Sequence, residues 1–108
     1  MKKNLIAIAG NQAFKITSVR DYKYVVVGRR SVEHLLTLRD NFAPAVVAQW
    51  EQMAAKGEKM GFLLDCWTTR MDLADKKATA LKNINHKGVP AYEDVQIIEV
   101  KPHYGVKS

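Results

Sequence analysis

The chain has 108 residues, with 47% hydrophobic and 26% charged residues, which is the size and composition of one globular domain spanning residues 1–108. This composition excludes a disordered tail, a collagen-like fibre and a membrane-embedded protein. The 17 Lys and Arg residues outnumber the 11 Asp and Glu residues, for a net charge of +6, which favours an anionic partner, most often nucleic acid. Cys66 has no partner for an internal disulfide, so we expect a buried thiol and a cytoplasmic protein.

The N-terminal part of the chain carries the patterns of three strands. Leu5–Ala9 is apolar but shorter than the core of a secretory signal, which needs roughly 7–15 residues, so we expect an edge strand there. Gly10-Asn11-Gln12 is a turn signal. Two further runs, Phe14–Val19 and Tyr22–Val27, flank a short polar turn and predict a β-hairpin.

Three helices are expected in the middle of the chain. Ser31 is a suitable N-cap for a first helix that runs to about residue 40. A second helix is expected to start near Pro44 and to end at Gly57, which tolerates the left-handed conformation. Thr69 and Asp72 have the spacing of a capping pair for a third helix, which runs to about residue 83.

Two more strands complete the pattern. Met60–Trp67 and Val95–Val100 are the predicted strands, and His86–Pro90 is a predicted loop. The resulting order of a strand, a hairpin, two helices, a strand, a helix and a strand predicts an α+β fold. We expect a small mixed or antiparallel sheet built on the hairpin, with three helices packed on it.

The expected core joins three of these elements. Trp50, Phe62 and Leu81 lie on the apolar faces of the second helix, the strand and the third helix, so we expect them to pack together. Strict alternation along the strand would place Phe62, Leu64 and Cys66 on the same face.

The segment from Phe14 to Gly28, followed by Arg29-Arg30 and a helix start, resembles the opening of the GIY-YIG nuclease domain. In that family the two hairpin strands carry the tripeptides Gly-Ile-Tyr and Tyr-Ile-Gly, separated by about ten residues. The corresponding positions here are Gln12-Ala13-Phe14 and Val26-Val27-Gly28. The resemblance extends from Ala13 to about Ile84 and implies a GIY-YIG-like scaffold with an extra strand at each end.

The resemblance also implies which chemistry to look for. The family hydrolyses phosphodiesters with one divalent ion, using a tyrosine on each hairpin strand, an arginine on the first helix and a glutamate on the third helix. Phe14 and Val26 stand at the tyrosine positions and have no hydroxyl. Lys76 and Lys77 lie where the metal would bind, near Asp75. We therefore expect the scaffold without the hydrolysis.

No other motif predicts a metal or a cofactor. His34, His86 and His103 share no ligand spacing with one another or with Cys66. The sequence contains no Walker A motif, dinucleotide-binding glycine pattern or Ser-His-Asp signature. We expect no metal, no cofactor and no membrane association.

Basic residues suggest where an anionic partner would bind. Arg29 and Arg30 precede the first helix, where backbone amides and two guanidinium groups would hold a phosphate. Tyr24 lies on the basic hairpin and would stack on an exposed base. The full set of predicted nucleic-acid-binding residues is Lys15, Arg20, Lys23, Tyr24, Arg29, Arg30, Arg39, Arg70, Lys76 and Lys77.

Three functions follow from these patterns. The first is a non-catalytic protein that binds DNA or RNA through the basic hairpin and helix faces. The second is an interaction protein, for example a virus-encoded inhibitor whose basic face docks on the acidic surface of a host nucleic-acid enzyme. The third is an active metal-dependent nuclease with a site rebuilt around Tyr24, Arg39 and either Asp72 or Asp75.

Overall fold

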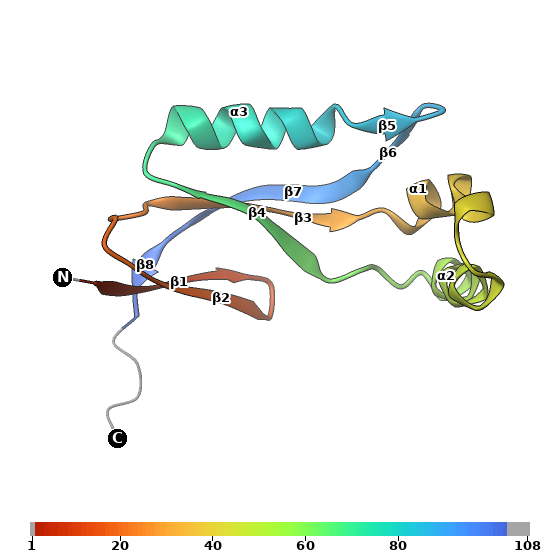
Figure 1. The fold of residues 1–108 in the computed structure, drawn as a ribbon, viewed down its shortest axis with the longest axis horizontal. Helices are drawn as coiled ribbons and strands as arrows, with labels where there is room; N and C mark the ends of the chain where they lie inside the picture. The colour runs from red at the N-terminus through yellow and green to blue at the C-terminus, as the bar shows by residue number, and fades with distance from the viewer. Residues whose placement is uncertain (1, 104–108) are drawn as a thin grey trace, which may run out of the picture.

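The computed structural model describes residues 2–103, and these form an α+β fold with three helices and three small antiparallel sheets (Figure 1). The N-terminal sheet has the strand order β2-β1-β8, and the central sheet has the order β4-β3-β7. The elements are β1 (Lys3–Ala9), β2 (Gln12–Ser18), β3 (Tyr24–Arg30), α1 (Val32–Thr37), a 3₁₀ turn (Arg39–Asn41), α2 (Pro44–Lys56), β4 (Phe62–Thr68), α3 (Met71–Lys82), β5 (Asn85–His86), β6 (Val89–Pro90), β7 (Tyr92–Glu99) and β8 (Lys101–Pro102).

The hairpin lies one strand earlier than predicted. β1 pairs with β2 across the turn at Gly10 and Asn11, whereas β3 pairs with β4 and β7 in the other sheet. Gly10 has a φ of 61°, a left-handed conformation that glycine adopts without strain. The predicted pairing of Phe14–Val19 with Tyr22–Val27 is therefore wrong, because β2 and β3 belong to different sheets.

The apolar run of β3 explains why that strand lies at the centre of its sheet. Val25, Val26 and Val27 are each 0% exposed. A strand buried on both faces reads as a continuous hydrophobic run, and only a central strand covered on both sides provides that burial. An exposed two-stranded hairpin would leave one of its faces in water.

The core consists of two separate clusters, one on each side of the central sheet. The sheet–sheet core packs Leu5, Ala7 and Ala9 of β1 against Val25, Val27, Phe62 and Val100. The helix–sheet core packs Val26 against Ala74, Ala78 and Leu81 of α3, which covers the other face (Figure 1). The prediction that Trp50, Phe62 and Leu81 pack together is wrong. Phe62 and Leu81 lie in different clusters, and Trp50 packs on Phe42 with ring centroids 4.9 Å apart.

The three helices do not share one sheet face. Only α3 lies along the central sheet, whereas α1 and α2 pack against each other at one end of the molecule (Figure 1). Ser31 caps α1 as predicted, since its Oγ accepts a hydrogen bond from the His34 backbone N at 3.3 Å. Gly57 ends α2 with a φ of 70°, also as predicted. The predicted capping pair of α3 is absent, because Arg70 is the N-cap residue and no side chain caps it.

Two β-bulges modify the alternation of the central sheet. Val26 pairs with Cys66 and Val27 with Leu64, so Asp65 is an extra residue in β4. Cys66 consequently packs in the helix–sheet core, while Leu64 packs in the sheet–sheet core, and the two do not share a face as alternation predicted. In β7 the bulge includes Asp94, a non-glycine residue with a φ of 52°.

Short elements near the C-terminus differ from the sequence pattern. The predicted loop His86–Pro90 is a small hairpin of β5 and β6, whose turn residues Lys87 and Gly88 have φ values of 54° and 80°. β7 begins at Tyr92 rather than Val95, and α1 ends at Thr37, before the 3₁₀ turn.

Candidate nucleic-acid interface

The N-terminal sheet and the loop that follows β2 carry most of the net positive charge of the chain. Residues 2–23 and β8 together contain six basic side chains and one acidic side chain, Asp21. Asp21 forms ion pairs with Lys3 at 3.5 Å and with Lys23 at 3.0 Å. Both lysines lower the pKa of its carboxyl group, and Lys23 has the larger effect. Among residues 2–103 no carboxylate lies within 4.0 Å of the four other basic side chains, which are Lys2, Lys15, Arg20 and Lys101.

The register of the sheet sets two of these lysines beside each other. Ile6 of β1 is paired with Lys15 of β2 on one side and with Lys101 of β8 on the other. Directly paired residues lie on the same sheet face, so Ile6, Lys15 and Lys101 share one. It is the outer face, because Leu5 and Ala7 on either side of Ile6 point into the core. Ile8, 57% exposed, lies next along that face. The outer face thus presents an apolar centre flanked by two ammonium groups.

Two grooves lie on this sheet around Asn4 and His103. One has a volume of about 440 Å³ and is lined by Lys3, Asn4, Leu5, Asp21, Pro102 and His103. The other, about 210 Å³, is lined by Asn4, Leu5, Lys15, Ile16, Thr17 and His103. Asn4 and His103 border both grooves and are joined by a 2.8 Å hydrogen bond from the His103 backbone N to the Asn4 carbonyl oxygen. Thr17 Oγ1 donates to Asn4 Oδ1, also at 2.8 Å.

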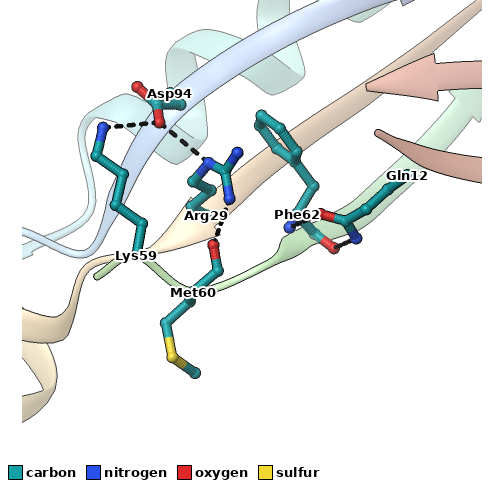
Figure 2. A network of polar contacts seen from close by, with 6 residues as sticks. All are labelled: Gln12, Arg29, Lys59, Met60, Phe62 and Asp94. Carbon is teal, nitrogen blue, oxygen red and sulfur yellow. Dashed lines mark hydrogen bonds and ion pairs between the residues drawn. The ribbon is translucent and has the colours of Figure 1, made fainter. Parts of the chain in front are cut away.

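Arg29 is engaged inside the protein rather than at this surface. Figure 2 shows its guanidinium between β4 and β7. Its Nη1 donates to the Met60 carbonyl oxygen at 2.6 Å, and its Cζ lies 3.9 Å from the centre of the Phe62 ring. Its Nε lies 3.1 Å from Asp94 Oδ2 and forms an ion pair with it. The geometry of this contact is not that of a hydrogen bond. Asp94 also pairs with Lys59 at 3.1 Å.

Arg30 makes a different set of contacts from Arg29. Its guanidinium lies 5.5 Å from the centre of the Tyr92 ring, and its Nη2 lies 3.4 Å from His34 Nδ1. Its Nε is buried, with no hydrogen-bond partner within the described part of the chain. Successive residues of a strand point to opposite faces, so the two arginines do not meet at one phosphate-sized site.

His34, which contacts Arg30, is a buried titratable residue. Its ring is T-shaped to His86, with centroids 6.3 Å apart, and Thr37 Oγ1 lies 3.0 Å from His86 Nδ1. Burial lowers the pKa of His34 most, and the charges of Arg30 and His86 lower it further. The neutral imidazole is therefore the form that fits this site.

The other predicted residues are dispersed. Lys15, Arg20 and Lys23 lie on or beside the N-terminal sheet, and Tyr24 packs against the helix–sheet core. Arg39 pairs with Glu51 at 3.5 Å near α2. Three more are linked to α3: Arg70, whose Nη2 lies 2.7 Å from Asp72 Oδ2, and the exposed Lys76 and Lys77.

Sequence reasoning missed four residues of this candidate interface: Lys2, Lys3, Lys101 and His103. The N-terminal lysines look like a solvated chain end, and a two-residue strand such as β8 is too short to produce a periodic pattern. Only the pairing of β8 with β1 brings Lys101 and His103 beside Asn4 and Lys15.

Within residues 2–103 no group of three His, Cys, Asp or Glu side chains is placed to hold a metal ion. None of the helices described here combines the length and the apolar character that crossing a membrane requires. No family model, no curated protein and no solved structure matches this chain.

Proposed function

We propose that this protein binds nucleic acid in the cytoplasm, without cleaving it, through the N-terminal sheet. The observation that carries the proposal is the charge of residues 2–23 and β8, with six basic side chains against Asp21 alone. A nucleic-acid backbone carries one negative charge per nucleotide, and its neutralisation by lysine and arginine releases counterions. Lys15 and Lys101, flanking Ile6 on the open face, are positioned for such contacts.

The non-catalytic part of the proposal rests on the two positions that correspond to the family tyrosines. Phe14 packs against the sheet–sheet core, whereas Val26 is fully buried in the helix–sheet core. The central sheet separates these two clusters, and neither side chain has a hydroxyl to orient a water molecule. Phe14 and Val26 therefore cannot take the role in hydrolysis that the two tyrosines have in GIY-YIG nucleases.

The proposal is tested by measuring binding of a labelled oligonucleotide at about 50 mM and about 200 mM salt, where phosphate contacts lose affinity steeply. The double substitution Lys15→Ala/Lys101→Ala should reduce the salt slope by about 2, one for each lost phosphate contact. The matched pair Lys76→Ala/Lys77→Ala removes the same charge from α3 and should leave the slope close to wild type. If both double variants reduce the salt slope equally, the nucleic acid does not bind at Lys15 and Lys101 in particular. If the wild-type protein shows no salt-dependent binding at all, the proposed function is refuted.

A protein-binding role is favoured by a separate observation on α2. That helix has no buried residue, and its Val46 and the preceding Phe42 are 37% and 42% exposed. An apolar surface of this kind suits a protein partner. Val46→Asp would disrupt such a contact without changing oligonucleotide affinity, so the two functions can be separated by measuring both.

A further inference from the structure

Resting on the proposed function, we infer that the two grooves beside His103 bind single-stranded nucleic acid, with an unpaired base entering the larger groove and the His103 ring stacking on it. The inference concerns which form of nucleic acid binds and where its bases lie. Three features of the N-terminal sheet carry it: the fixed hairpin tip, the position of the cations and the lining of the grooves.

The tip of the β1–β2 hairpin is not available for insertion into a duplex. A two-stranded ribbon reads duplex DNA by entering the major groove. Here the tip is fixed against the central sheet, because Gln12 is hydrogen-bonded to Phe62 and a Cβ at Gly10 would lie only 3.5 Å from the Phe62 ring. The stretch from Asn4 to Phe14 also contains no charged residue to meet the phosphates of a duplex.

The cations lie instead at the open end and the middle of the ribbon, next to the grooves. Lys3, which is also ion-paired with Asp21, lines the larger groove, and Lys15, which has no carboxylate of the described residues within 4.0 Å, lines the smaller one. A backbone that passes from one groove to the other would cross Asn4 and His103, with an ammonium group on each side. This arrangement follows a single strand better than the two phosphate rows of a duplex.

The lining of the larger groove matches the chemistry of a nucleobase. Leu5 and Pro102 provide apolar surface, while Asn4 and the carboxylate of Asp21 provide groups for a polar base edge. Its volume of about 440 Å³ is within the range of pockets that hold small molecules. Bases in a duplex remain stacked and cannot enter a groove of this kind, whereas unpaired bases stack readily on aromatic rings, histidine included.

The test compares three labelled probes of about 12 nucleotides, a site size typical of single-strand binders: oligo-dT, oligo-rU and a DNA duplex. We expect one or both single strands to bind at least about tenfold more tightly than the duplex, and His103→Ala to weaken that binding about tenfold, as expected for one lost stacking contact. His103→Phe should restore the affinity, which a purely structural role of the imidazole would not allow. Lys87→Ala, in the distant β5–β6 turn, is the matched control and should have no effect.

The possible failures are distinguishable. Equal affinity for duplex and single strands, or unchanged single-strand binding by His103→Ala, would refute this inference and leave the proposed function standing. Absence of salt-dependent binding to all three probes would refute the proposed function itself. Urea unfolding of each variant confirms that the comparison is made between folded proteins.

Discussion

The side-chain amide of Gln12 forms two hydrogen bonds with the main chain of Phe62, a residue 50 positions away in the sequence (Figure 2). Gln12 Nε2 donates to the Phe62 carbonyl oxygen at 3.1 Å, and the Phe62 backbone N donates to Gln12 Oε1 at 2.6 Å. The amide thus satisfies a donor and an acceptor of β4 in the way a neighbouring strand would. This contact links the β1–β2 hairpin, which carries the candidate interface, to the central sheet.

Gln12→Ala should therefore destabilise the protein by about 1–3 kcal/mol, because it leaves two part-buried backbone groups without partners. Gln12→Glu should also be destabilising, since a carboxylate accepts from the Phe62 N–H but repels its carbonyl oxygen. Urea unfolding measures both changes. Gln49→Ala, an exposed glutamine on α2, is the control, and an equal loss there would show that the paired contact has no special role.

The two core clusters should respond independently to substitution. Phe62→Ala should cost about 3–5 kcal/mol, a large share of the stability of a small domain. The milder pair Phe62→Leu and Leu81→Ala should add to within about 0.5 kcal/mol, because the two residues lie in different clusters. A double-mutant cycle on unfolding free energies checks this, and a large coupling would show that the clusters act as one core.

Stability should decrease as the pH falls below 6.5, the ordinary pKa of histidine. Burial, Arg30 and His86 lower the pKa of His34 in the folded state, so the unfolded chain binds the proton more tightly. The stabilisation is complete above pH 6.5 and is lost as the pH falls toward the lowered value. Urea midpoints at about pH 8 and about pH 5 measure this change.

The matched variant for this pH dependence is His34→Gln, which removes the titrating group. The change in stability between the two pH values should then be smaller than in wild type. A variant with the same pH dependence as wild type would show that His34 is not the group responsible for the effect.

The protein should leave supercoiled DNA and structured RNA intact in the presence of Mg²⁺ or Mn²⁺, including under conditions where it binds them. The positions of the two tyrosines carry Phe14 and Val26, and Lys76 and Lys77 disfavour a hard cation on α3. Asp72 is already paired with Arg70. Agarose gels after incubation with metal measure cleavage. Nicking that persists through purification and disappears in Asp72→Ala or Asp75→Ala would establish the nuclease alternative instead.

Much of the local structure was predictable from the sequence because it depends on neighbouring residues. Ser31 caps the start of α1, and Pro44 and Gly57 mark the start and end of α2, as predicted. These signals are local, since capping and φ preferences act within one helical turn. The α+β class followed from the order of apolar periods along the chain. The basic character of the N-terminal part of the chain was also evident, with Lys15, Arg20 and Lys23 all in the predicted set.

The pairing of strands and the composition of the interface required the tertiary structure. Alternating polarity identifies a strand but not its partner, so β2 was predicted to pair with β3 although it pairs with β1. One inserted residue, Asp65, reverses the faces beyond it and places Cys66 opposite to the prediction. The charge of a residue did not predict whether its side chain is engaged within the fold. Arg29 contacts Met60 and Asp94, whereas Lys101 lies exposed on the two-residue strand β8. Contacts between residues far apart in sequence decide whether a basic side chain is used inside the fold or remains available to a partner.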